Sequence, residues 1–131
     1  YLTDYPKKQF PNFDQSASAL LDDLADRGML DNTLVIFGTE FGRSPKINQW
    51  GGRDHWWNCY TLMFAGAGVE GGRVIGDSDH QGGYPATEAF GPRNMLMSVY
   101  QHLGLDTART LRDAGIVDQD APIRGLFGNA G

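Results

Sequence analysis

The strongest constraint on the fold is an apolar run, TLVIFG, at residues 33–38. It combines β-branched and aromatic side chains without polar alternation, which is typical of a strand covered on both faces. A similar run, YTLMFAG, spans residues 60–66, and a shorter run, RVIG, spans residues 73–76. The sequence therefore predicts interior strands of a sheet.

Two amphipathic helices alternate with these apolar runs. In the first, apolar side chains recur at helical spacing between Asn12, which can cap the start, and Gly28, which suits the residue after the end. In the second, Pro92 occupies the first turn and Gly104 provides the stop. Helices that alternate with buried strands favour an α/β layered sheet over a helical bundle or an all-β sandwich.

Charge and composition exclude several classes of function. The net charge is −5 and there is no cluster of Lys or Arg, so nucleic acid is not an expected partner. No apolar run approaches the roughly 20 residues that a membrane helix needs, so we expect no membrane span in this segment. Cys59 is the only cysteine, so any metal would be held by histidine and carboxylates rather than by a thiolate cluster.

The first candidate site residues lie in a predicted loop that begins GTEFGRSP, directly after the first apolar run. Ligands gather at the carboxyl ends of strands in open α/β sheets, and Glu40 stands at such an end. We expect Glu40 to be a metal ligand or a base, the alternative being a pairing with Arg43 that only orders the loop. The guanidinium of Arg43 suits a tetrahedral oxyanion such as phosphate or sulfate, or else is simply exposed or ion-paired.

Two further segments offer oxygen and nitrogen ligands. In GGRDHWW, Asp54 supplies a hard oxygen and His55 an imidazole, a combination compatible with zinc, manganese or calcium. The alternative for this pair is an ordinary hydrogen bond within the loop. In GDSDHQGGYP, Asp77, Asp79 and His80 lack the full EF-hand pattern, which favours an acidic turn over a calcium loop.

Several of these segments together resemble a bacterial sulfatase-like family of unknown function within the alkaline phosphatase superfamily. They are LLDDLADRGMLDNTLVIFGTEFGRSPKIN, GRDHWWN, AGAGVEGGRVIGDSD and GPRNMLMSVYQHLGLD, in that order along the chain. The resemblance implies a three-layer α/β/α sandwich of the alkaline-phosphatase type. Residues 1–131 would then be the C-terminal part of one such domain, with the nucleophile upstream of them.

The resemblance also implies an activity, namely metal-dependent hydrolysis of a sulfate or phosphate ester carried by a small molecule or a glycan. A divalent metal would activate the upstream nucleophile and polarise the ester oxygen, while an arginine would steady the developing charge. The segment alone would be inactive. The predicted metal ligands are Glu40, Asp54 and His55, and the predicted charge-stabilising residues are Arg43 and Arg53.

One residue departs from the pattern of that superfamily. Phe41 stands where His or Asn is usual, and phenylalanine cannot bind a metal. The alternative function is therefore a catalytically silent protein that binds an anionic ligand or organises a cell-surface assembly. Relatives in the resembled family often carry a twin-arginine leader, so we expect export to the periplasm or the cell surface. The oligomeric state stays open.

Overall fold

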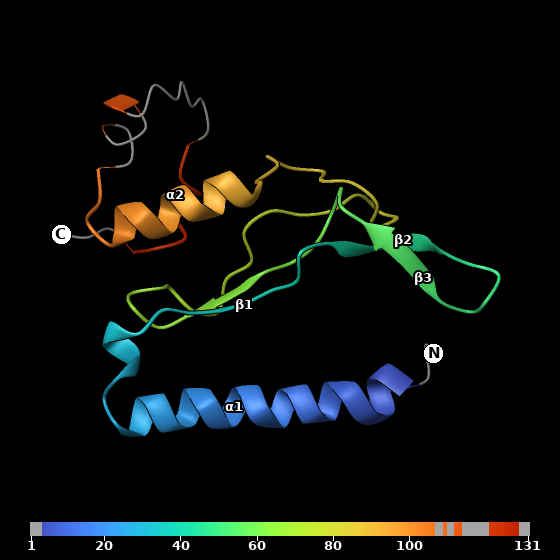
Figure 1. Ribbon diagram of the computed structural model, residues 1–131, viewed down its shortest axis with the longest axis horizontal. Helices are drawn as coiled ribbons and strands as arrows, with labels where there is room; N and C mark the ends of the chain where they lie inside the picture. The colour runs from blue at the N-terminus through green and yellow to red at the C-terminus, as the bar shows by residue number, and fades with distance from the viewer. Residues whose placement is uncertain (1–3, 107–108, 110–111, 114–120, 129–131) are drawn as a thin grey trace.

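The computed structural model describes residues 4–106, 109, 112–113 and 121–128 (Figure 1). The elements are a π-helical turn (Tyr5–Gln9), α1 (Phe10–Asp26), a 3-10 turn (Leu30–Asn32), β1 (Val35–Phe37), β2 (Gly42–Ile47), β3 (Arg53–Trp56), β4 (Met63–Ala65) and α2 (Pro92–His102). The strands form two separate antiparallel sheets, one of β1 with β4 and one of β2 with β3. In Figure 1, α1 and α2 run on opposite sides of β1, and the β2–β3 hairpin lies at one end of the view.

The predicted three-layer α/β/α sandwich is wrong. The apolar run at 33–38 forms only the three-residue strand β1, whose one neighbour is the antiparallel β4, with Ile36 opposite Phe64. The run RVIG forms no strand, and Val74 is 93% exposed. Among the described apolar side chains only Leu126 is buried. An apolar run indicates side chains that favour burial, but it does not show that other parts of the same chain bury them.

The helices were predicted from the sequence more accurately than the sheet. As predicted, α2 begins at Pro92 and is followed by Gly104, whose φ of +77° suits a residue without a side chain. Gly28 likewise follows α1 with a φ of +64°. The prediction that Asn12 caps α1 is wrong, because the helix already begins before it and places Pro11 in the first turn. Proline suits that turn since it has no backbone N–H to leave unpaired.

Two contacts tie the helices to the rest of the fold. The ring of Phe13 on α1 meets the ring of Phe37 on β1 edge to face, with centroids 5.5 Å apart. The hydroxyl of Ser98, on α2, accepts a hydrogen bond of 2.8 Å from the N–H of Ile123, which fixes the C-terminal segment against that helix. As expected, no helix in the described part of the chain is long and apolar enough to cross a membrane.

Candidate functional site

Most of the predicted site residues lie on the β2–β3 hairpin, where the sequence predicted a loop. The two strands pair antiparallel, with Gly42 opposite Trp56 and Arg43 opposite His55. Gly42 has no room for a side chain, because a Cβ there would overlap the carbonyl oxygen of Cys59. Strand β2 reads GRSPKI, and its composition did not indicate a strand, because Gly, Pro and Lys are depleted in strands.

The turn of the hairpin is held by the side chain of Asn48. Its carbonyl oxygen accepts hydrogen bonds from the N–H groups of Trp50 (3.1 Å) and Gly52 (3.0 Å). Its amide nitrogen donates to Oδ1 of Asp54 at 2.8 Å. Asp54 therefore makes the hydrogen bond within the loop that was the alternative to metal binding. Ligation by Asp54 stays a prediction.

Of the two candidate arginines, Arg53 is used to brace the hairpin. Its Nη1 atom donates to the carbonyl oxygens of Ser44 at 2.9 Å and of Pro45 at 2.6 Å, on the opposite strand. The guanidinium of Arg43 has one weaker bond of this kind, 3.4 Å long, to the carbonyl oxygen of Arg53. The other N–H groups of the Arg43 guanidinium make no hydrogen bond among the described residues.

Arg43, His55 and Phe41 form a cluster that we call the Arg43–His55 face. Arg43 and His55 are directly opposite on neighbouring strands, so their exposed side chains share one face of the hairpin. The ring of Phe41 stacks on the imidazole of His55 with centroids 3.9 Å apart, and Cζ of Arg43 lies 5.6 Å from the Phe41 centroid. No carboxylate of the described residues pairs with Arg43, so the alternative pairing with Glu40 is not formed.

The three predicted metal ligands do not converge in the same way. Asp54 and His55 are successive residues of β3, so their side chains project from opposite faces of the strand. Glu40 lies in the bend before β2, where its exposed carboxylate makes no described hydrogen bond or ion pair. Across the ranges that the structure describes, no group of three or more His, Cys, Asp or Glu side chains could hold a metal ion. A divalent metal therefore stays a prediction, and one that needs further ligands.

The loop GDSDHQGGYP packs beside the hairpin and forms an acidic turn. Oδ1 of Asp79 accepts hydrogen bonds from the N–H groups of Gly83 at 2.8 Å and Gln81 at 3.1 Å. The bond from Gly83 is the largest cause that lowers the pKa of Asp79, and the bond from Gln81 adds to it. The indole N–H of Trp56 donates to the carbonyl oxygen of Gly83 at 2.6 Å, which anchors this turn on β3.

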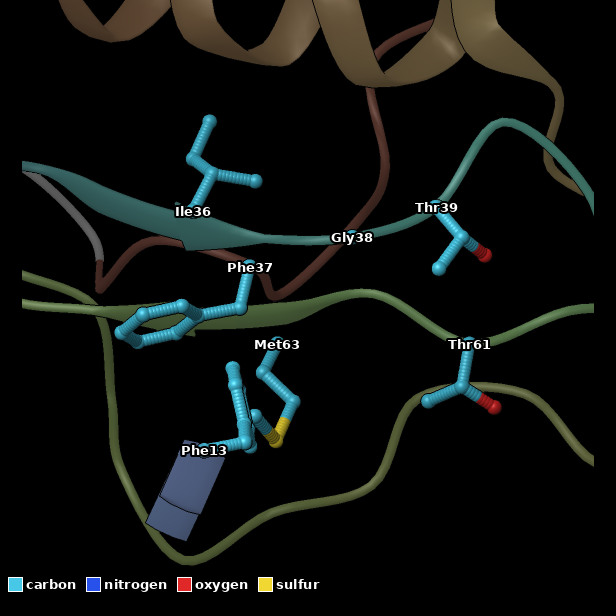
Figure 2. A pocket seen from close by; sticks show the side chains of 7 residues that line it. All are labelled: Phe13, Ile36, Phe37, Gly38, Thr39, Thr61 and Met63. Atoms are coloured by element: carbon cyan, nitrogen blue, oxygen red, sulfur yellow. The ribbon is translucent and has the colours of Figure 1, made fainter. Parts of the chain in front are cut away.

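A separate apolar hollow of about 440 Å³ lies between α1 and the β1–β4 sheet. In Figure 2, Phe13 and Met63 lie on the same side of the sheet as Phe37, whereas Ile36 points to the opposite side. None of the predicted site residues lines this hollow, so it is distinct from the Arg43–His55 face. Its lining residues are Phe13, Ile36, Phe37, Gly38, Thr39, Thr61 and Met63.

Comparison with known proteins identifies a family but no activity. Neither the curated proteins nor the solved structures contain a match to this chain. One family model matches residues 1–126, and that family is not a sulfatase or an alkaline phosphatase family. The predicted membership of the alkaline phosphatase superfamily is therefore wrong, because a series of shared short segments does not by itself define a superfamily. From this match over nearly its whole length, the chain belongs to the family described as "Protein of unknown function (DUF1501)".

Proposed function

We propose that the Arg43–His55 face binds the sulfate or phosphate group of an anionic ester. The observation that carries this proposal is the direct cross-strand pairing of Arg43 with His55 above the ring of Phe41. A guanidinium presents a planar fork of N–H donors, and an imidazole adds a further donor beside it. Tetrahedral oxyanions offer several acceptor oxygens, so one such group can accept bonds from both side chains.

Phe41 acts as a support for this pair rather than as a ligand. Its ring contacts the imidazole by stacking and lies under the guanidinium, so both polar groups are held over one apolar surface. Arg53 contributes indirectly, because its two bonds to the backbone of β2 fix the distance between the strands. The face is therefore held in place before any ligand arrives, which lowers the entropy cost of binding.

Hydrolysis of the bound ester with a divalent metal is a second candidate function. It is favoured by Glu40, an exposed carboxylate without a described partner, directly before Phe41 in the chain. Catalytic zinc sites usually have three protein ligands, and this part of the protein offers Glu40 and His55 without a converging third. Binding without turnover, as in the silent alternative, is therefore the function that the hairpin geometry supports better.

Isothermal titration calorimetry with sodium sulfate and with sodium phosphate tests the binding proposal. The net charge of −5 repels anions, so the titration needs physiological ionic strength, where the Debye length is about 8 Å. Loss of a hydrogen bond to a charged group costs about 1.5–3 kcal/mol, so Arg43→Gln should weaken binding by about 10- to 100-fold.

The matched control is Arg27→Gln, which removes the same charge from an exposed ion pair at the end of α1. This variant should bind both anions as the wild type does. Failure of the wild type to bind either anion, or equal binding by Arg43→Gln, would refute the proposal. Turnover of p-nitrophenyl sulfate or phosphate that requires zinc, manganese or calcium and disappears in Glu40→Gln would establish the second candidate. Because the nucleophile of that candidate was expected upstream of residues 1–131, binding without such turnover by the full-length protein would eliminate it.

A further inference from the structure

Trp57 is an exposed aromatic residue at the end of the Arg43–His55 face. It directly follows the last residue of β3 and is 74% exposed. Its neighbour Trp56 is used inside the fold, where the indole N–H bonds to Gly83 and the ring meets that of Tyr84 edge to face. Among the described residues, no aromatic ring packs against Trp57. The face of its indole is therefore accessible to a ligand.

Strand alternation places Trp57 on the same side of the hairpin as His55. Successive residues of a strand project to opposite sides, so Trp56 shares one side with Gly42, its cross-strand partner. Trp57 and His55 share the other side, about 6.7 Å apart along the strand direction. The chain beyond Trp57 returns on the Gly42 side, because the carbonyl oxygen of Cys59 fills the space that a Cβ of Gly42 would need. This return therefore leaves the side of His55 and Trp57 uncovered.

The same side of the hairpin thus presents two kinds of group in a fixed order. The guanidinium of Arg43 and the imidazole of His55 offer N–H donors, and Trp57 offers a flat aromatic surface one step further along. Planar rings stack on such a surface, and every nucleobase has a π-face that can do so. A ligand that fits both groups carries an anionic ester at one end and a planar ring at the other.

We propose that the ester bound here is a nucleoside monophosphate, with its phosphate at Arg43 and His55 and its base stacked on Trp57. This inference rests on the proposed function, because the phosphate occupies the same anion site. It goes further by assigning the group that the ester carries.

Two features favour a single nucleotide over related ligands. The ribose separates the base from the phosphate, which suits the step of about 6.7 Å between His55 and Trp57, whereas the ring of an aryl ester is bonded to the ester oxygen itself. A nucleic acid polymer needs many phosphate contacts, and the net charge of −5 without a cluster of Lys or Arg does not provide them. One cationic pair matches one phosphate group.

Calorimetric titration of the intact protein with adenosine monophosphate and with ribose 5-phosphate tests the proposal, since the two ligands differ only in the base. The wild type should bind adenosine monophosphate about 5- to 150-fold more tightly, the gain expected from one stacked base. Trp57→Ala should remove this preference and leave the dissociation constant of ribose 5-phosphate within about twofold of the wild type. Trp57→Phe should keep part of the preference, because a smaller ring still stacks.

The matched control is Trp50→Ala, which removes an indole that is 71% exposed from the turn of the same hairpin. This variant should keep the full preference for adenosine monophosphate. If ribose 5-phosphate binds and Arg43→Gln weakens it, but the base adds nothing or its gain survives Trp57→Ala, the anion site stands and the nucleotide assignment is overturned. Binding of phenyl phosphate as tightly as adenosine monophosphate would also overturn that assignment. If neither phosphate ligand binds, the anion site and the nucleotide assignment both fail.

Discussion

The C-terminal segment depends on the hydroxyl of Ser98, and replacement of that residue by alanine should measurably destabilise the fold. Ser98 is 2% exposed, and its Oγ donates to the carbonyl oxygen of Asn94 at 2.6 Å while it accepts from the N–H of Ile123. Ser98→Ala leaves that N–H without a partner, at a cost of about 1–3 kcal/mol. The better helix propensity of alanine offsets about 0.5 kcal/mol. We therefore expect the free energy of unfolding to fall by about 1.5 kcal/mol.

Ser16→Ala on α1 is a closely matched control. The Oγ atom of Ser16 also donates to the carbonyl oxygen four residues earlier, that of Asn12, at 2.8 Å, but it is exposed and accepts no described hydrogen bond. Its replacement should change the free energy of unfolding by less than about 0.5 kcal/mol. Thermal unfolding followed by circular dichroism should show a Tm lower by about 6 °C for Ser98→Ala alone. Equal melting of the two variants would refute the role assigned to the buried hydroxyl.

Two further outcomes are expected. Gly42→Ala should lower the free energy of unfolding by about 1–3 kcal/mol in urea titrations, because its Cβ would overlap the carbonyl oxygen of Cys59. Gly71→Ala, where a Cβ meets nothing within 4 Å, should cost much less. The pKa of Asp79 is lower in the folded protein than its ordinary value of 3.8, so its contribution is complete above that value and is lost as the pH falls through the folded pKa. Urea midpoints of the wild type should therefore drop in acid more than those of Asp79→Asn, and equal drops would contradict this assignment.

The helices were predictable because their signals are local. The apolar spacing, the proline at the start of α2 and the glycines after both helices act within one or two turns of the chain. Pro11 was the local exception, since it allowed α1 to begin earlier than the cap signal of Asn12 indicated. The strands of the β1–β4 sheet were also located correctly as apolar runs.

The architecture was not predictable, because it depends on contacts that a local pattern does not encode. TLVIFG indicates a strand whose two faces favour burial. Whether further strands, helices or another chain bury those faces depends on contacts between residues that are distant in sequence. The β2–β3 hairpin was missed for a related reason. Its pairing depends on the turn hydrogen bonds of Asn48 and on the close approach at Gly42, neither of which leaves an alternating apolar pattern.

The candidate site was predicted in composition but not in geometry. Arg43 and His55 were both identified, yet residues 44–54 between them had to form a hairpin before the two could lie opposite one another. Sequence spacing placed Asp54 beside His55, but strand alternation separates their side chains. Suitable residue types in the sequence therefore predicted a metal site whose ligands do not converge. They did not predict the Arg43–His55 face, because that face forms only when β2 and β3 pair.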